Sequence, residues 1–196
     1  KKMKSYLLGI SLDILKKKQN GEFLIDKILD AANQKGTGGW STNAALELGV
    51  AFDTITASVM ARNISAKKED RIAAAELYKT DQEAGNLHLE DLFKAYRAGS
   101  IINHAIGFDL LLEASKNYDW NLNLSEIARI WTNGCIIRSG FMEDLIKLFK
   151  ASPSNNILLN KDLVPELSVL KEPMLGTLAG AIQKGCPMQL LSAAAN

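Results

Sequence analysis

Apolar residues recur at spacings of three and four along most of the chain, the pattern of helices with one buried face. Near the amino terminus Tyr6, Leu7, Ile10 and Ile14 follow this spacing within a predicted helix that runs from Met3 to Leu15. The longest pattern spans residues 89–118 and is apolar over so much of its surface that this helix should be central. The other predicted helices cover residues 23–32, 41–48, 53–65, 68–78, 124–132, 135–150 and 171–184, and a polar connector covers 80–87.

Capping and turn residues support these boundaries. Asn123 followed by Glu126 has the arrangement of a capping box. Gly49 and Gly185 suit the left-handed position after a helix, and Asn133-Gly134 is typical of a turn. No β-branched stretch alternates for long enough to indicate a strand. The predicted fold class is therefore all-α, with residues 1–196 forming one multi-helix domain around a long central helix.

Composition and charge exclude several classes of partner. The 196 residues are 47% hydrophobic and 23% charged, as in an ordinary globular protein. A net charge of +1 provides no strong field for nucleic acid or anionic membranes, and no stretch approaches the ~20 apolar residues of a membrane span. Cys135 and Cys186 have no disulfide or zinc spacing, which favours a reducing cytoplasm. Because the chain begins without methionine and ends within a helical pattern, neighbouring domains are expected beyond both ends.

The glycine-rich segment Lys35–Trp40 is the main candidate for binding chemistry. Gly36, Gly38 and Gly39 let a ligand approach the backbone closely, while Lys35 and Thr37 add a positive charge and a hydroxyl. A helix predicted to begin at Ser41 would offer its amides and its dipole to an anion. The lysine precedes the glycines, unlike that of a nucleotide P-loop. These residues are equally compatible with a phosphate site and with a plain turn between two helices.

Arg62 shifts the balance toward a phosphate. It follows Ile55 by seven residues and Val59 by three, which predicts that it projects from the apolar face of its helix. A buried arginine needs a partner. An internal carboxylate is the common one, and a phosphate shared with Lys35 is the alternative, because guanidinium donors match phosphate oxygens.

The remaining candidates for catalysis or cofactor binding are weak. His88 and His104 have no second ligand at metal-binding spacing, so we expect packing or capping roles and no metal site. No strand and helix carry the glycine fingerprint of dinucleotide binding. If a cofactor is used, its main domain lies outside this chain.

Several blocks of sequence together resemble the decarboxylating 6-phosphogluconate dehydrogenases. They are Lys35–Trp40 (KGTGGW), residues 44–50, Ala61-Arg62, Trp120–Asn123, Trp131, Gly134–Ser139, Gly107-Phe108 and Gly185–Met188. The resemblance covers nearly the whole chain and concerns the family's all-helical C-terminal domain, truncated at both ends.

The resemblance implies an enzyme of the pentose phosphate pathway that oxidises 6-phosphogluconate with NADP+ and releases carbon dioxide and ribulose 5-phosphate. NADP would be bound mainly by an N-terminal Rossmann domain, and the catalytic lysine and glutamate would lie upstream of Lys1. This domain would form the homodimer and bind the substrate phosphate through Lys35, Thr37 and Arg62. A tail of the partner subunit would complete that site, so the isolated domain should be inactive.

Departures from the family pattern leave one alternative open. Gly39 stands where a lysine is usual, Thr132 and Asn133 replace an arginine and a glycine, and the segment around His104 differs from the family. None of these changes affects Lys35, Thr37 or Arg62. The alternative is a non-catalytic helical module that dimerises or binds a phosphorylated ligand, which the presence or absence of an upstream dinucleotide fingerprint would distinguish.

Overall fold

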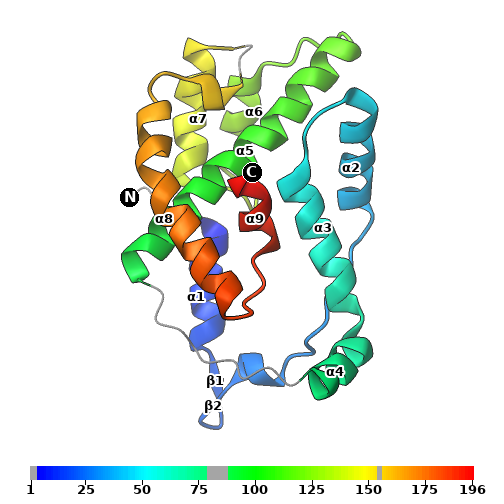
Figure 1. Cartoon of the computed structure of the whole chain (residues 1–196). Helices are drawn as coiled ribbons and strands as arrows, with labels where there is room; N and C mark the ends of the chain where they lie inside the picture. The colour runs from blue at the N-terminus through cyan, green and yellow to red at the C-terminus, as the bar shows by residue number, and fades with distance from the viewer. Residues whose placement is uncertain (1–3, 79–87, 154–155) are drawn as a thin grey trace. The chain divides into compact units, whose positions relative to one another are not determined.

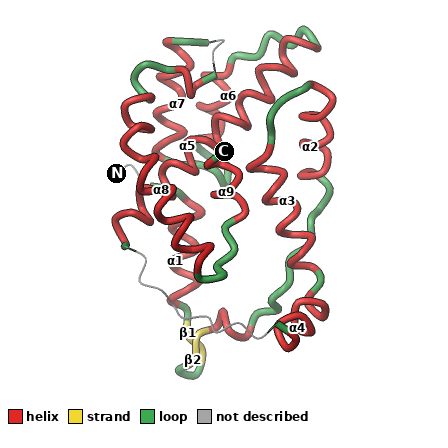
Figure 2. The backbone as a smooth tube through the Cα atoms, in the orientation of Figure 1, coloured by secondary structure: helices red, strands yellow, loops and turns green. Residues whose placement is uncertain are grey.

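The computed structural model describes residues 4–78, 88–153 and 156–196 (Figure 1). Helices dominate these residues, and the sheet seen among them is one short two-stranded pair (Figure 2). The predicted all-α class is therefore confirmed, while the predicted connector at 80–87 lies outside the described residues. The chain divides into two compact units, Lys1–Asp30 with Asn121–Asn155, and Ala31–Trp120 with Asn156–Asn196.

The first unit is built around two helices packed on each other. Ser125 Oγ on one of them donates a hydrogen bond to the Ile146 carbonyl on the other at 3.1 Å. Asn123 caps the first helix by accepting from the Glu126 N–H at 3.1 Å, as the sequence predicted. The elements of this unit are α1 (Tyr6–Lys16), β1 (Lys18–Gln19), β2 (Glu22–Phe23), the 3-10 helix η1 (Leu24–Lys27), α6 (Leu124–Trp131) and α7 (Gly140–Ala151).

A β-hairpin and a 3-10 turn replace the helix predicted for residues 23–32. Asn20 and Gly21 both have positive φ, 53° and 88°, which is the geometry of a tight hairpin turn. Lys18 then pairs with Phe23 across the two strands. The prediction was wrong because no apolar face is buried here: Ile25, Ile28 and Leu29 are all exposed, so no packing stabilises an α-helix over these residues.

Helix α7 begins five residues later than predicted. Ser139 is extended, with φ −158°, and forms an antiparallel bridge with Ser5 ahead of α1. Its hydroxyl also accepts from the Met142 N–H at 3.2 Å, capping the helix. Pairing with a segment distant in sequence therefore decides this boundary, and the apolar run from Cys135 contains no sign of it.

The second unit contains the long central helix and the helices packed around it. Figure 1 shows α5 beside α8, and α2 beside α3, pairs that are also in direct contact. The elements of this unit are α2 (Thr37–Leu48), α3 (Asp53–Ala66), α4 (Lys68–Leu77), α5 (Leu89–Asn117), the 3-10 helix η2 (Ile157–Leu159), α8 (Val164–Gln183) and α9 (Gln189–Ala195). The predicted α3, α4 and α5 are confirmed to within one residue.

Small residues on α5 allow its neighbours to pack closely. Ala98 and Ala105 are almost completely buried. At Gly99 an added Cβ would lie 3.3 Å from Leu191 Cδ1 of α9, tighter than most real contacts. Helix α5 is therefore central to its unit, as its apolar pattern predicted.

Helix α8 begins at Val164, seven residues before its predicted start. Pro165 occupies the first turn, where its missing N–H costs nothing. The helix continues through Pro173 because Leu170 and Met174 on either side are buried in the core. Tertiary packing thus overrides a residue that usually ends a helix. Among the described residues, no helix combines the length and the apolar character needed to cross a membrane.

Candidate functional site

The glycine-rich segment forms the amino terminus of α2. Gly36 takes φ 95°, which glycine adopts readily, and the helix begins at Thr37 rather than at the predicted Ser41. The Trp40 N–H makes the first turn's bond, to the Gly36 carbonyl at 3.0 Å. The amides of Thr37, Gly38 and Gly39 therefore have no acceptor within the helix, which makes this end suited to an anion.

Gly38 lets the first turn of α2 approach α3 closely. A Cβ at this position would lie only 2.6 Å from Cγ2 of Val59, a buried residue of α3. Ser41 and Thr42 donate their hydroxyls to the Gly38 carbonyl at 3.0 and 2.9 Å, which strengthens the same turn. The glycine thus serves helix packing as well as access to the backbone.

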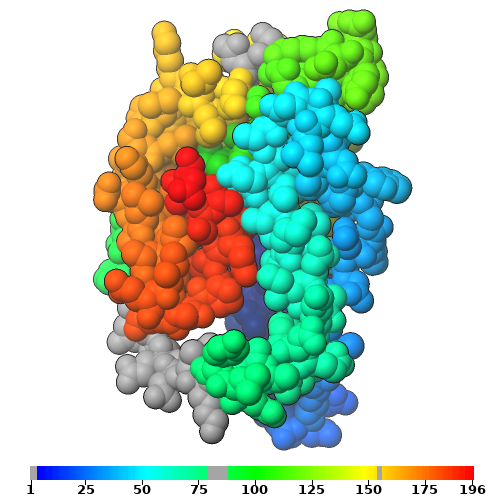
Figure 3. Space-filling view, turned by 45° about the vertical axis from the view of Figure 1, so that its right-hand side comes forward, coloured from blue at the N-terminus to red at the C-terminus, as the bar shows by residue number. Residues whose placement is uncertain are grey.

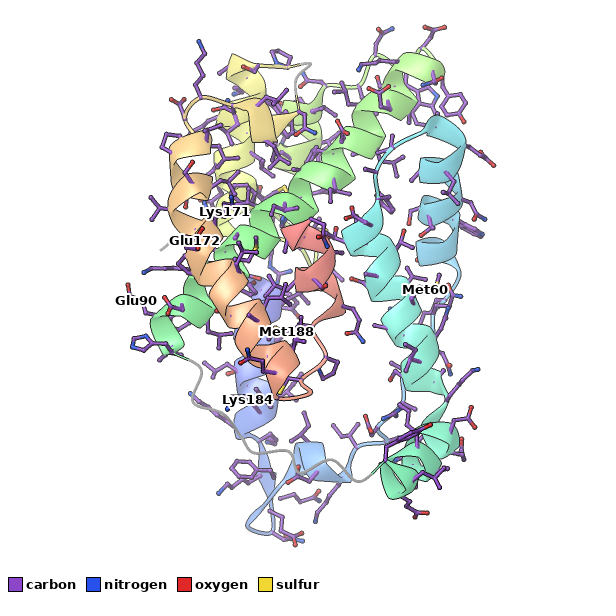
Figure 4. The ribbon with its side chains drawn as sticks, viewed as in Figure 1. Met60, Glu90, Lys171, Glu172, Lys184 and Met188 are labelled. Carbon is purple, nitrogen blue, oxygen red and sulfur yellow. The ribbon has the colours of Figure 1, made fainter. Side chains whose placement is uncertain are left out.

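Arg62 lies on the surface, and its predicted burial is wrong. Its side chain is exposed, and Nη2 donates to the Asn33 carbonyl at 2.9 Å. Apolar spacing failed here because the buried residues of α3 are Thr54 and Val59, so the buried face of the helix ends before Arg62. Met60, labelled in Figure 4, locates this part of α3 two residues before Arg62.

The structure nevertheless brings Arg62 to the segment that carries Lys35 and Thr37. Asn33, which accepts the Arg62 hydrogen bond, is two residues before Lys35. Lys35 and Thr37 are themselves exposed. Ala32, just before Asn33, donates its N–H to Ser65 Oγ on α3 at 3.1 Å. Arg62 is therefore hydrogen-bonded to the segment that carries Lys35, Thr37 and the amino-terminal amides of α2.

The two histidines have surroundings typical of structural residues. His104 Nδ1 lies 2.7 Å from the Ser100 carbonyl one turn earlier, and burial lowers the pKa of this imidazole. His88 is exposed at the N-cap of α5. Cys135 and Cys186 are both free thiols. In the described ranges, no group of three or more His, Cys, Asp or Glu side chains could hold a metal ion.

Sequence reasoning missed two polar contacts in this unit. Arg97, buried on α5, forms a two-pronged ion pair with Glu166 of α8, with distances of 3.0 and 3.3 Å. Ser65, which holds Ala32, was also not singled out. Its position three residues after Arg62, on a neighbouring part of the same helix face, was the available signal.

Comparison with known proteins assigns the chain to a family. The family described as "6-phosphogluconate dehydrogenase, C-terminal domain" matches residues 1–196. The chain belongs to this family. The decarboxylating 6-phosphogluconate dehydrogenases of Shigella boydii and Escherichia coli are each 38% identical over 98% of the chain, which covers 44% and 42% of those proteins.

A solved structure supports the same family assignment. A 6-phosphogluconate dehydrogenase from Plasmodium falciparum superposes with a TM-score of 0.91 and 33% identity, covering 97% of this chain and 43% of that one. That protein was solved in its apo form, with its cofactor NADP+ and with its substrate 6-phosphogluconate. The chain therefore spans less than half the length of the 6-phosphogluconate dehydrogenases it matches.

Proposed function

We propose that this chain is the substrate-binding and dimer-forming domain of a cytoplasmic oxidative decarboxylase. The reaction would convert 6-phosphogluconate and NADP+ into ribulose 5-phosphate, carbon dioxide and NADPH in the pentose phosphate pathway. Support comes from family membership and from the decarboxylating dehydrogenases that match nearly the whole chain. Residues 1–196 would act as one domain of that larger protein.

Within this domain, Lys35, Thr37 and Arg62 would bind the phosphate of the substrate. The observation that carries this assignment is the hydrogen bond from Arg62 to Asn33, which places the guanidinium beside the segment leading to Lys35. A guanidinium has five N–H donors, so one bond to a carbonyl leaves others for phosphate oxygens. The unpaired amides at the start of α2 add donors and a favourable dipole.

The rest of the protein would supply NADP binding and the catalytic proton transfers. The described residues contain no parallel strand followed by a helix of the dinucleotide-binding kind, so NADP would be bound mainly outside residues 1–196. We therefore assign no NADP contact to this chain. Its own contribution is to bind and orient the phosphate end of the substrate, and the domain alone should be inactive.

Alanine substitutions in the full-length protein test the phosphate assignment. Lys35→Ala and Arg62→Ala should each weaken substrate binding by roughly 1.5–3 kcal/mol, or about 10- to 150-fold in KM for 6-phosphogluconate. The KM for NADP+ should barely change. Lys171→Ala, which removes an exposed lysine from α8 (Figure 4), is the matched control.

An unchanged KM for 6-phosphogluconate in both variants would refute the assignment. A full-length protein that binds phosphate through Lys35 but reduces no NADP+ would instead support the non-catalytic module.

The exposed apolar side chains of α1 support the proposed homodimer. None of the residues of α1 is buried, although the helix is rich in apolar side chains. Leu12 and Leu15, for example, are 51% and 55% exposed. Such a face is typical of an interface with another surface. We expect light scattering of the full-length protein to give a dimer mass, and a monomer mass at high concentration would contradict the proposal.

A further inference from the structure

The segment from Ala32 to Gly38 lies along one side of α3 and contacts it at three places. Ala32 N–H bonds to Ser65 Oγ, the Asn33 carbonyl accepts from Arg62, and Gly38 packs against Val59. Residues 65, 62 and 59 are three apart, so their side chains are neighbours on the helix surface. The segment therefore runs antiparallel to α3, and the helix acts as a template for it. Figure 3 shows α2 and α3 side by side, with α9 (red) against α3.

Ser65 stands out among the serines of α3 because its hydroxyl reaches outside its own helix. Ser58 makes the usual bond of a helical serine, donating to the Thr54 carbonyl at 3.0 Å. Ser65 instead accepts from the Ala32 backbone at 3.1 Å. Its carbonyl also accepts from Arg71 Nη2 of α4 at 3.2 Å, which ties down the end of α3 at the same residue.

We propose that Ser65 is a positioning residue for the phosphate site. It does not touch the ligand. By holding Ala32 it fixes the start of the segment that carries Lys35 and Thr37, so that this segment is ordered before the ligand arrives. A preordered segment loses less conformational freedom on binding, which strengthens affinity. The proposal rests on the phosphate site proposed above.

Substitutions at Ser65 in the full-length protein test this role by kinetics. Ser65→Ala should raise the KM for 6-phosphogluconate and the inhibition constant of inorganic phosphate by roughly 3- to 10-fold, the scale of one hydrogen bond. The kcat and the KM for NADP+ should stay unchanged. Ser65→Thr keeps the hydroxyl and should restore nearly normal values. Ser58→Ala removes a hydroxyl of the same helix that does not reach the segment, and should have no effect.

Hydrogen exchange tests the same contact without relying on activity. In Ser65→Ala, the backbone amide of Ala32, which loses its acceptor, should exchange faster than in Ser58→Ala, while α5 should be unaffected. This measurement separates local release of the segment from loss of the whole fold, which would accelerate exchange throughout the protein.

The outcomes distinguish the two proposals. Unchanged exchange in Ser65→Ala overturns the positioning role directly. Faster exchange with an unchanged KM also overturns it, and leaves the phosphate site standing if Lys35→Ala still raises KM. If Lys35→Ala and Arg62→Ala leave KM unchanged as well, the phosphate site itself is wrong and the role of Ser65 falls with it.

Discussion

Arg62 and Arg97 lie on different helices of the same unit, and they differ in burial and in the kind of partner that each one binds. Arg97 is 7% exposed and is paired with the carboxylate of Glu166 through two hydrogen bonds. Arg62 is exposed and donates to a backbone carbonyl. One guanidinium is neutralised inside the protein, whereas the other keeps its charge at the surface beside a helix amino terminus.

This difference separates a structural arginine from one suited to a ligand. Removing a buried charge from water is costly and requires a charged partner, so the guanidinium of Arg97 is committed to Glu166. A neutral carbonyl leaves the charge of Arg62 uncompensated and available to an anion. Arg97 is thus the buried arginine that needs a partner, whereas Arg62 is suited to an anion because of its neighbours.

The largest expected effect is at the buried pair. Glu166→Gln leaves the Arg97 charge without its carboxylate and should lower the free energy of unfolding by about 2–4 kcal/mol, measured by urea denaturation. The KM for 6-phosphogluconate should not change. Glu90→Gln breaks the exposed pair with Lys94 on α5 (Figure 4) and should leave stability unaltered. Equal effects of the two variants would show that burial does not distinguish these pairs.

The adjacent glycines of α2 should respond in opposite directions. Gly38→Ala forces a methyl group against Val59 and should cost about 1–3 kcal/mol of stability, with a raised KM for 6-phosphogluconate as α2 moves. Gly39→Ala meets nothing nearer than Gln34 Oε1 at 3.5 Å and should stabilise the helix by roughly 0.5–1 kcal/mol.

Thermal melting of both variants checks this contrast. A second substitution, Val59→Ala, should relieve part of the Gly38→Ala effect, because it removes the atom that the new methyl group meets. Additive losses in the double variant would exclude this contact as the cause.

A smaller effect is expected when Arg62 keeps its charge but loses its planar shape. Lysine has no planar fork of donors that could bind both Asn33 and a phosphate. Arg62→Lys should therefore raise the KM for 6-phosphogluconate roughly fivefold, which corresponds to a loss of about 1 kcal/mol of binding free energy. Unfolding by urea should be unchanged. A normal KM would indicate that only the charge at this position matters.

The smallest effect is expected at His104, which lies on α5 about two turns after Arg97. Burial, together with the charge of Arg97, lowers the pKa of His104 in the folded protein. The unfolded chain therefore takes up the proton first as pH falls below about 6.5. Stability from this residue should be complete above that pH and should decline as pH falls toward the folded pKa. Urea denaturation at several pH values should show a smaller loss of stability on acidification in His104→Gln than in the unchanged protein.

Local patterns in the sequence were sufficient to locate most helices, and they nominated the candidate residues. The three-and-four spacing located α3, α4 and α5, and Asn123 marked the start of α6, because helices and their caps depend on residues a few positions apart. The glycines with Lys35 and Thr37 identified a surface segment suited to an anion, since those properties belong to the residues themselves.

Tertiary structure decided the features that depend on distant residues. Pairing of Ser139 with Ser5 set the start of α7, and core packing carried α8 through Pro173. Distant residues also determine why Arg97 is buried and Arg62 is exposed. Helical spacing allows a residue to face inward, but the neighbouring elements decide whether it does. Glu166 lies 69 residues from Arg97, and Asn33 lies 29 from Arg62, so both partners became visible only in the folded chain.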